Sequence, residues 1–354
     1  MTATARRIDG GHREYEEVVF CDDPAAGLKG IVAIHDTTLG PALGGVRMWP
    51  YESEDEALED VLRLSRAMTF KAAVAGLALG GGKAVVIGDP RRDKSESLWR
   101  SFGRFVDGFG GRYIAAEDVG TSVEDLTAVA RETDHAAGLA GGGGDPSPVT
   151  AYGVFRGILA AARHRLGVPS LAGMRVAVQG LGHVGRQLCE LLAGEGAALV
   201  VADLDAARVR RACARFGAEA AEANAIHATD VDILAPCALG ATLNDRTIPE
   251  IAAAVVAGAA NNQLAEDRHG RSLQERGILY APDYVINAGG IINISCELDG
   301  YDRDRALART GRIYDTLAGI FARADRERLP TNAIADRIAA ERLAAPAQRA
   351  APLR

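Results

Sequence analysis

The feature that most constrains the fold of this chain is a glycine-rich turn between a predicted strand and a predicted helix. The segment MRVAVQGLGHVGRQLCELL contains Gly180, Gly182 and Gly185 in the spacing GxGxxG. Gly180 permits a tight turn, Gly182 lets the backbone approach a pyrophosphate, and Gly185 allows the helix to pack closely on the strand. The start of the helix offers unpaired N–H groups to the phosphates. The segment therefore predicts a dinucleotide-binding unit, with a cofactor-free turn as the alternative.

The acidic residue that such a unit needs follows at the expected place. A second predicted strand, ALVVAD, ends at Asp203, about 20 residues after the turn. Its carboxylate would accept hydrogen bonds from the adenosine ribose and repel a 2′-phosphate. Because no arginine directly follows Asp203, the sequence favours NAD over NADP. The predicted cofactor contacts on the turn are Gly180, Leu181, Gly182, His183, Val184, Gly185 and Arg186.

Length and composition are those of a globular protein with more than one domain. The chain has 354 residues, 48% of them hydrophobic and 25% charged, and a formal net charge of −7. At about 150 residues per domain, this length predicts two domains. The acidic balance argues against nucleic acid as a partner, because phosphate binding needs a clustered basic excess.

Localisation and metal content are predicted from what the sequence lacks. Apolar runs are too short, or too interrupted by glycine and charge, to cross a bilayer, and the first 17 residues lack the apolar core of a secretory signal. None of the five cysteines forms a CxxC pair, and no two histidines have HExxH spacing. We therefore expect a reduced, soluble, cytoplasmic protein that holds no metal and binds no membrane.

The pattern of apolar residues predicts an α/β chain. In the first third, strands alternate with helices capped by Asp93 and Thr121, and a glycine cluster, Gly80–Gly82, precedes a strand. The segment GLAGGGGDPSP cannot lie inside a regular element, so it marks a linker or a loop that lines a site. From residue 175 to 281 strands and helices alternate, which predicts a parallel sheet wrapped by helices. One last helix is expected over 303–326.

Lysine is rare in this chain. Of the 40 basic residues only four are lysines, and two of them, Lys71 and Lys83, lie in one short glycine-rich stretch. Lysine, unlike arginine, can lose its proton when it is desolvated or placed beside another cation. The pair therefore indicates a site for proton chemistry, with a solvated loop as the simpler alternative.

Six motifs carry a resemblance to a known family. They are LGPALGGVRMWP, MTFKAAVAGLALGGGKAVVIGDP, RYIAAEDVGT, GDPSPVTAYGVFRGI, GAANNQL and APDYVINAGGIINI. In collinear order from about residue 17 to residue 330, the chain resembles the leucine, valine and phenylalanine dehydrogenases of the glutamate dehydrogenase superfamily, and the leucine enzymes most closely. The number and length of the motifs make the resemblance highly specific.

The resemblance implies an α/β fold of two domains with a cleft between them. Residues 1–136, together with a C-terminal tail over about 330–354, would form a mixed-sheet domain that binds substrate and makes subunit contacts. Residues 137–329 would form a Rossmann-type NAD-binding domain. Dimers and octamers both occur in this family, so a homo-oligomer is expected and its size stays open.

The resemblance also implies chemical roles. Lys71 is similar to the family's carboxylate-binding lysine, Lys83 to its catalytic lysine, and Asp118 to the aspartate that relays protons to and from the substrate amine. Two ammonium groups that lie close together and are partly buried lower each other's pKa. One of them can then act as a general base. Without the two lysines, a loop aspartate before a helix would be the plain interpretation of Asp118.

The implied reaction is the NAD-dependent oxidative deamination of an amino acid to a 2-oxo acid and ammonia, and its reverse. Hydride leaves the substrate Cα for the nicotinamide, and the catalytic lysine activates the water that attacks the resulting iminium. By the same resemblance, the polar contacts near the reacting centre are Asn262, Thr150 and Asn287. Cys237 and Ala238 would be wall residues beside the cofactor, although a buried apolar filler is the stronger interpretation of Cys237.

The predicted substrate pocket is apolar. Glutamate enzymes carry a lysine at the position of Leu43 and a serine at that of Ile294, and an apolar wall cannot satisfy a second carboxylate. At Ala116 the leucine enzymes also have alanine, whereas phenylalanine enzymes tend to have glycine. The expected lining residues are Leu43, Gly44, Met68, Ala116, Ile291 and Ile294. Ordinary core packing is an open alternative for each of them.

Two side chains narrow the expected choice of substrate. Ile291 and Ile294 stand where leucine enzymes tend to have smaller valines, and a methylene in an apolar pocket is worth about 1–3 kcal/mol of discrimination. We therefore expect a branched-chain substrate, namely leucine, valine or isoleucine. A phenylalanine dehydrogenase and a non-catalytic NAD-binding regulator are the alternatives.

Overall fold

The structure is a computed structural model that describes residues 4–7, 14–139 and 143–345. The chain splits into two compact units. The first comprises residues up to Gly144, residues 294–302 and residues from Ala339 onward, and the second comprises 145–293 and 303–338. The sequence-based division at 136/137, with a return near 330, therefore differs from these bounds.

A contact between distant segments explains the later boundary. The backbone N–H groups of Gly138 and Gly143 both donate to the carboxylate of Glu297. The described ends of the glycine-rich loop are thereby held to residues 294–302 of the same unit. Composition marks this loop as a linker but cannot indicate a partner so far along the chain.

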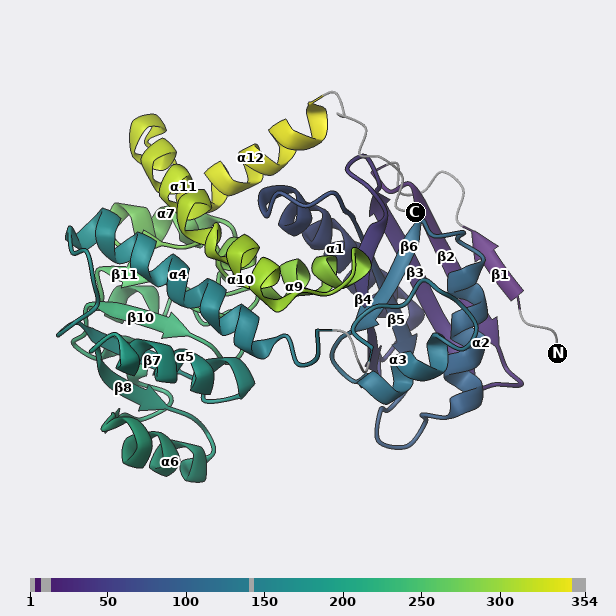
Figure 1. Ribbon diagram of the computed structural model, residues 1–354, viewed down its shortest axis with the longest axis horizontal. Helices are drawn as coiled ribbons and strands as arrows, with labels where there is room; N and C mark the ends of the chain where they lie inside the picture. The colour runs from purple at the N-terminus through teal and green to yellow at the C-terminus, as the bar shows by residue number, and fades with distance from the viewer. Residues whose placement is uncertain (1–3, 8–13, 140–142, 346–354) are drawn as a thin grey trace. The chain divides into compact units, whose positions relative to one another are not determined.

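A mixed sheet forms the first unit. Its strands are β1 Thr4–Arg7, β2 Glu17–Asp23, β3 Leu28–Asp36, β4 Ala42–Trp49, β5 Gly80–Ile87 and β6 Tyr113–Glu117. They are hydrogen-bonded in the order β1-β2-β3-β5-β4-β6 (Figure 1). Neighbours are antiparallel from β1 to β5, and β4 is parallel to both β5 and β6. The expected mixed sheet is confirmed.

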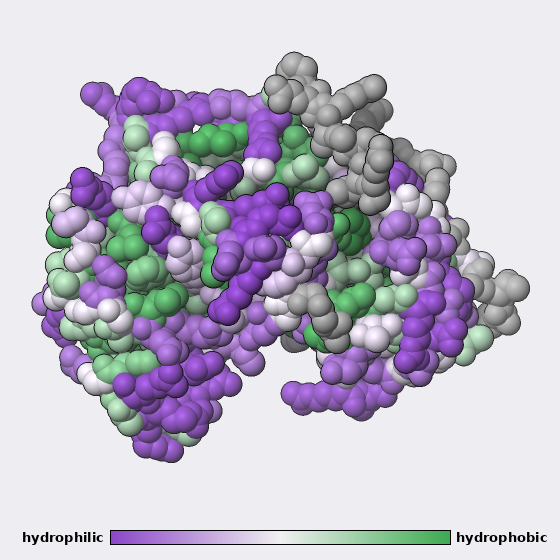
Figure 2. All heavy atoms as spheres, viewed as in Figure 1, coloured by the Kyte–Doolittle hydropathy of each residue, from purple (hydrophilic) through white to green (hydrophobic). Residues whose placement is uncertain are grey.

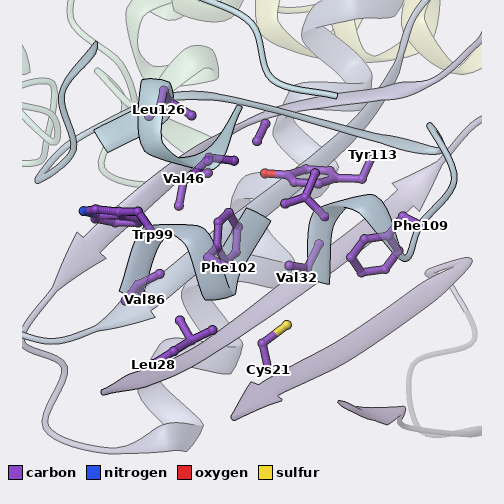
Figure 3. Packing of buried hydrophobic residues seen from close by; sticks show 14 of the residues in the cluster. Cys21, Leu28, Val32, Val46, Val86, Trp99, Phe102, Phe109, Tyr113 and Leu126 are labelled. Carbon is purple, nitrogen blue, oxygen red and sulfur yellow. The ribbon is translucent and has the colours of Figure 1, made fainter. Parts of the chain in front are cut away.

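Helices cover both faces of this sheet. They are α1 Glu54–Val74, α2 Glu96–Asp107 and α3 Val123–Val129. Residues of α1 pack with Val85 of β5, whereas Trp99 and Phe102 of α2 join a buried cluster with Val86 on the other face (Figure 3). Because side chains alternate along a strand, Lys83 lies on the same face as Val85, under α1.

The glycine cluster is part of a strand and not a turn before one. Gly80–Gly82 are the first residues of β5, so the prediction that they precede the strand is wrong. A Cβ on Gly81 would overlap the backbone of Thr69 in α1. Glycine is therefore needed here for the close approach of helix and strand. In the sequence, glycines of this kind look the same as the glycines of a turn.

Two helix starts also differ from expectation. The N-cap residues of α2 and α3 are Ser95 and Ser122, and not Asp93 and Thr121. The Thr121 hydroxyl instead donates to the carbonyl oxygen of Val46. Thr121 thereby ties the loop after β6 to strand β4.

A parallel sheet forms the second unit, as the alternating pattern predicts. Its strands are β7 Arg175–Gln179, β8 Ala198–Ala202, β9 Glu219–Ala220, β10 Ile233–Pro236, β11 Val255–Val256 and β12 Leu279–Tyr280. Their order is β12-β11-β10-β7-β8-β9, and every pairing is parallel. The helices that follow β6 and α3 are α4 Ser147–Leu166, α5 His183–Gly194, α6 Ala206–Phe216, α7 Arg268–Glu275, α8 Asp283–Ile286, α9 Gly289–Leu298, α10 Arg303–Gly311, α11 Ile313–Glu327 and α12 Thr331–Ala344.

The C-terminal helices differ from the single helix expected over 303–326. Helices α10 and α11 meet at Arg312, and α12 follows Pro330. Arg342 of α12 donates to the carbonyl oxygens of Ala73 and Leu77. This guanidinium places a positive charge at the C-terminal end of α1, where the helix dipole is negative.

Polar and apolar side chains are mixed on the surface of the described residues (Figure 2). No helix within the described ranges is both long and apolar enough to cross a membrane. Figure 2 shows hydrophilic residues spread among the apolar ones over the visible face. All five cysteines lie within the described ranges and are free thiols.

Candidate active site and cofactor site

The structure brings Lys83 and Asp118 into direct contact. Lys83 lies within β5 and is 4% exposed. Its Nζ is 3.0 Å from Oδ2 of Asp118, which directly follows the last residue of β6. The Asp118 backbone N–H donates to the hydroxyl of Thr121 at 2.9 Å, which fixes the turn after the strand.

Two glycines of β4 make room for this pair. A Cβ on Gly44 would overlap the carbonyl oxygen of Gly82, next to Lys83 in the chain. A Cβ on Gly45 would lie only 2.7 Å from the Cβ of Asp118. The small size of these residues thus serves the close approach of β5 and of Asp118. The predicted contact of Gly44 with substrate stays a prediction.

A second cation, Arg47 of β4, completes the cluster. Its Nε is 3.0 Å from the same Asp118 Oδ2, and its Nη1 is 2.9 Å from Oδ2 of Asp60 in α1. The Tyr51 hydroxyl donates to that Asp60 oxygen at 2.7 Å, and Arg63 contacts the other Asp60 oxygen at 2.7 Å. Within the described ranges, no protein group donates to Asp118 Oδ1.

Arg47 was not among the sequence-based candidates, although a signal for it exists. Arg47 shares one face of β4 with Leu43 and Gly45, which are both buried. A charged side chain at such a position needs a partner of opposite charge. Its sequence pattern alone therefore indicates an ion pair, but not with which carboxylate.

The cluster shifts the ionisation of both its acid and its base. Burial lowers the pKa of Lys83, the Asp118 carboxylate opposes this change, and the charge of Arg47 adds to it. Burial alone would raise the pKa of Asp118, but Lys83 and Arg47 hold it below its ordinary value. A lysine with a lowered pKa is the expected feature. Burial is the largest cause of the lowered pKa of Lys83. The neighbouring cation that adds to it is Arg47, which contacts Asp118.

The other predicted substrate residues of the first unit lie on nearby elements. Lys71 and Met68 lie in the C-terminal part of α1, and both are partly buried. Leu43 and Ala116, in β4 and β6, are 1% and 3% exposed. Ile294 lies on the part of α9 that belongs to this unit. The predicted shared pocket of these residues stays a prediction.

Each glycine of the GxGxxG turn has the local geometry that its predicted role requires. Gly180 has φ of +99°, and a Cβ there would lie 2.8 Å from that of Ala238. Around Gly182, the space within 4 Å of an added Cβ is empty. A Cβ on Gly185 would overlap the Gly180 carbonyl oxygen. Helix α5 then starts at His183 without a side-chain cap, so its first N–H groups suit a phosphate.

The predicted ribose-binding carboxylate is fixed by backbone donors. Asp203 accepts from the N–H of Leu181 at 2.6 Å and of Asp205 at 2.8 Å. Burial alone would raise the pKa of Asp203, but these hydrogen bonds, with Arg208 beside it, hold the pKa below its ordinary value. The Arg208 guanidinium lies 3.6 Å from the carboxylate. The lowered pKa keeps this carboxylate ionised at neutral pH, directly after β8, and its contact with a ribose stays a prediction.

An arginine-lined cavity beside the turn was not predicted. Its volume is about 330 Å³, and its charged lining consists of four arginines on α5 and α6. Within the described ranges Arg186 and Arg211 have no ion-pair partner, whereas Arg208 contacts Asp203 and Arg215 contacts Glu190. The lining residues are Leu181, Gly182, His183, Arg186, Arg208, Arg211, Ala212, Arg215 and Phe216.

One buried polar atom fits the nicotinamide end of a cofactor. The Nδ2 group of Asn287 donates to the carbonyl oxygen of Ala259 at 3.1 Å and to Oδ1 of Asn261 at 2.7 Å. Its own Oδ1 is buried and has no partner. An acceptor in this state suits an amide donor of a ligand. Thr150, by contrast, donates its hydroxyl to the carbonyl of Pro146.

The remaining predicted residues of the second unit have local roles that the structure defines. Burial raises the pKa of the Cys237 thiol to about 12, so this partly buried side chain is a neutral thiol. Ala238 is exposed and faces Gly180. Asn262 has a left-handed φ of +50°, and its carbonyl accepts the N–H of Ala241 at 2.6 Å. Ile291 is buried in α9.

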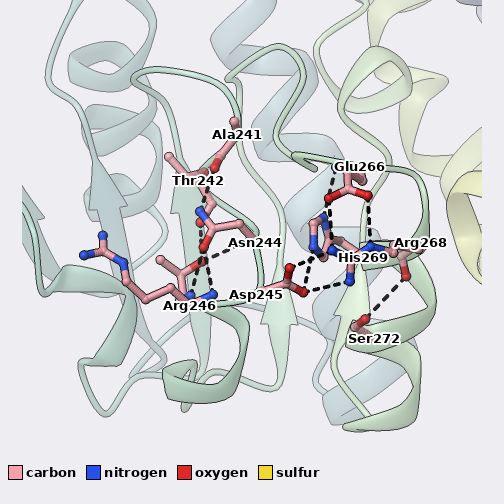
Figure 4. Close-up of polar contacts among 10 residues, drawn as sticks. Ala241, Thr242, Asn244, Asp245, Arg246, Glu266, Arg268, His269 and Ser272 are labelled. Carbon is pink, nitrogen blue, oxygen red and sulfur yellow. Dashed lines mark hydrogen bonds and ion pairs between the residues drawn. The ribbon is translucent and has the colours of Figure 1, made fainter.

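A cluster of Asp245, Glu266 and His269 has the ligand types of a metal site, but a cation already occupies it (Figure 4). Arg268 contacts both carboxylates, at 2.6 and 2.9 Å. His269 Nδ1 accepts the backbone N–H of Glu266, so its proton is on Nε2, which donates to Asp245. The ring thus has no lone pair left for a metal. The cluster ties Asp245, in the segment between β10 and β11, to α7.

Substitutions at two glycines of the turn test the cofactor site. For Gly182→Ala we expect an unchanged free energy of unfolding, because the methyl meets open space, and a loss of NADH affinity of about tenfold or more, about 1.4 kcal/mol. For Gly185→Ala we expect destabilisation by about 2 kcal/mol or more, because its methyl overlaps a backbone carbonyl. Urea unfolding and fluorescence titration with NADH measure the two effects. Equal losses of stability in both variants would contradict the assigned roles.

Comparison with known proteins identifies the family. The dimerisation domain of the Glu/Leu/Phe/Val dehydrogenases matches residues 15–135, and the Glutamate/Leucine/Phenylalanine/Valine dehydrogenase domain matches residues 201–304. Leucine dehydrogenase of Bacillus cereus is 57% identical over 334 residues, covering 94% of this chain and 91% of that protein. Phenylalanine dehydrogenase of Thermoactinomyces intermedius is 50% identical over 334 residues, covering 93% and 91%.

A solved structure supports the same conclusion. The crystal structure of L-tryptophan dehydrogenase from Nostoc punctiforme matches with a TM-score of 0.84 at 47% identity, and the match covers 93% of this chain and 96% of that one. The fold, the glycine-rich turn and the sequence matches agree. The chain belongs to the Glu/Leu/Phe/Val dehydrogenase family.

Proposed function

We propose that this leucine dehydrogenase-like amino acid dehydrogenase catalyses the NAD-dependent oxidative deamination of an apolar branched-chain L-amino acid, and the reverse reductive amination. The forward reaction consumes the amino acid, NAD⁺ and water, and yields a 2-oxo acid, ammonium, NADH and a proton. The observation that carries the proposal is the contact between the buried Lys83 amine and the Asp118 carboxylate.

Lys83 has the properties of a general base. Because burial lowers its pKa, a neutral amine is available closer to neutral pH than in a solvated lysine. In the forward direction the neutral Nζ would take a proton from the water that attacks the substrate carbon. In the reverse direction the same group would return that proton.

Asp118 is suited to exchange protons with the substrate amine. Its Oδ2 is engaged by Lys83 and Arg47, while Oδ1 has no donor among the described residues. An ammonium group must lose a proton before the adjacent carbon can give up hydride. Oδ1 would accept that proton and later deliver it to the departing ammonia.

The cofactor site would supply the redox partner. A nicotinamide held at this site would supply the acceptor for the hydride of the substrate Cα. The uncapped start of α5 and the open space at Gly182 would hold the pyrophosphate, and Asp203 would hold the adenosine ribose. The unpartnered Oδ1 of Asn287 would accept from the nicotinamide amide, with Thr150 and the wall residues Cys237 and Ala238 nearby.

The substrate pocket would be closed by apolar walls and one cation. Lys71 would bind the substrate carboxylate, and Asn262 would contact the amine. The buried Leu43 and Ala116 would exclude a second carboxylate, because an ion left there would lack a partner. The other proposed wall residues are Gly44, Met68, Ile291 and Ile294. Phenylalanine is the second candidate substrate, because a phenylalanine dehydrogenase is 50% identical to this chain.

The family match supports an oligomer, but not a particular number of subunits. Residues 15–135 match a dimerisation domain, so we propose a homo-oligomer built through the first unit. A dimer and an octamer both satisfy this observation. The small-molecule partners would be the amino acid, the 2-oxo acid and ammonia.

A panel of L-amino acids tests the function. With NAD, we expect NADH formation to be fastest for leucine, valine or isoleucine, and Lys83→Ala to lower kcat by about 100-fold or more because the general base is lost. Lys29→Ala is the matched control, because Lys29 pairs with Glu54 at the surface and should leave kcat unchanged. A preference for phenylalanine would refute the pocket argument. Full activity of Lys83→Ala would refute the assigned base.

The choice between NAD and NADP rests on opposing charges. The Asp203 carboxylate would repel a 2′-phosphate, which supports NAD. The fold nevertheless brings Arg208 to 3.6 Å from Asp203, beside the arginine-lined cavity. The absence of an arginine directly after Asp203 is therefore weaker support for NAD than the sequence suggests.

Cofactor kinetics of two variants separate these effects. We expect the wild type to prefer NAD over NADP by about tenfold or more in kcat/KM. Asp203→Asn should reduce this preference by removing the repulsion, and adding Arg208→Gln to it should restore part of the preference by removing a cation. Equal use of both cofactors by the wild type would contradict the assignment of NAD.

A further inference from the structure

Arg47 links the buried pair to a second carboxylate. One edge of its guanidinium contacts Asp118 through Nε at 3.0 Å, and another contacts Asp60 through Nη1 at 2.9 Å. About a quarter of the Arg47 side chain is exposed, at 23%, compared with 6% for Lys83. Arg47 therefore lies behind the carboxylate that Lys83 contacts, at the edge of the buried cluster.

We propose that Arg47 is a positioning residue for the proposed reaction, which keeps Asp118 ionised and oriented when Lys83 loses its proton. This inference rests on the proposed function, since it concerns the protonation cycle of the same site. It goes beyond that function because it assigns Arg47 as the counter-ion that Asp118 keeps while Lys83 is neutral.

The argument for a permanent cation follows from the role of the lysine. A general base is neutral for part of each turnover, and a neutral Lys83 no longer balances the Asp118 charge. A buried carboxylate without a counter-ion is costly and would take up a proton. A protonated Asp118 could not accept the proton of the substrate amine. Arginine stays charged at every working pH, so Arg47 supplies the balance that a second lysine would not guarantee.

The surroundings of Arg47 hold it in place for this task. Asp60 of α1 is itself fixed by the Tyr51 hydroxyl on one oxygen and by Arg63 on the other. The guanidinium is thus bound between two carboxylates whose own positions are set by other elements. Charge-assisted contacts of this kind are directional, which fixes Asp118 Oδ2 and leaves Oδ1 for the substrate.

The charged groups around Lys83 come from several elements. Arg47 reaches it from β4, Asp118 from the loop after β6, and Asp60 from α1. Lys71 lies on the last turn of α1, and has contacts of its own. On β3, His35 is bonded to Thr69 at 2.9 Å. Among these, Arg47 is the cation in contact with the Asp118 carboxylate besides Lys83 itself.

The expected pH effect has a definite sign. The Arg47 charge lowers the pKa of Lys83 and that of Asp118. Without this charge both values rise, so the neutral lysine is reached only at higher pH. The low-pH limb of kcat for oxidative deamination should therefore move upward in Arg47→Gln by about one pH unit. Asp60 acts oppositely on Lys83, so Asp60→Asn should move the limb downward.

Three further comparisons make the test specific. Arg47→Lys keeps a positive charge, so its low-pH limb should lie close to that of the wild type. Arg92→Gln is the matched control, because Arg92 pairs with Asp89 at the surface, and its pH limb should stay at the wild-type value. NMR titration of the Lys83 side chain, with Lys83→Met for assignment, measures the pKa of Lys83 without any substrate. In each variant this pKa should shift in the same direction as the low-pH limb of kcat.

The outcomes separate this inference from the proposed function. If the wild type forms no NADH with any amino acid, the proposed function fails, and the NMR titration still decides whether Arg47 controls Lys83. If Arg47→Gln lowers kcat equally at every pH and leaves the Lys83 titration unchanged, Arg47 is only structural and the inference is overturned. Should Arg47→Gln not fold, Asp60→Asn carries the test: a downward shift of the low-pH limb and of the Lys83 titration supports the inference, and no shift overturns it.

Discussion

The burial of one amine on a sheet face is the constraint from which the candidate catalytic site follows. Lys83 lies within β5 under α1, where a charge is stable only beside an opposite charge. Asp118 meets that need, and Gly45 must lack a side chain so that Asp118 can approach. Because the carboxylate itself becomes buried, Arg47 and then Asp60 are drawn into the same network. The fold of the first unit is arranged around these contacts.

The second unit applies a different principle to an anionic ligand. It offers backbone N–H groups at the start of α5, space where Gly182 has no side chain, and a fixed carboxylate at Asp203. Arginines on the adjacent helices add positive charge beside this site. For the proposed cofactor, backbone geometry would supply most of the binding, whereas side-chain charge would decide between NAD and NADP.

Sequence reasoning succeeded where the signal is local. The turn with Gly180 and Asp203, the strand Arg175–Gln179 and the parallel order of the second sheet follow from spacing and periodicity. Lys83 was indicated by the rarity of lysine in the chain, whereas Asp118 and the chemical roles of both residues came from the family resemblance. Arg47 was missed because its partner Asp118 lies 71 positions away, and Gly80–Gly82 were misassigned because close packing and turns both use glycine. Contacts between distant segments were the part that no local pattern contains.

A crystal structure with L-leucine and NADH, a pair that cannot exchange hydride, measures the central claim most directly. The account predicts the leucine nitrogen at about 2.6–3.2 Å from Asp118 Oδ1, with the Lys83 amine directed at the leucine Cα or at a water beside it. Arg47 should remain on Asp118 Oδ2 in that complex. Leucine bound with its nitrogen away from Asp118, or with Lys83 facing no ligand atom or water, would contradict the account.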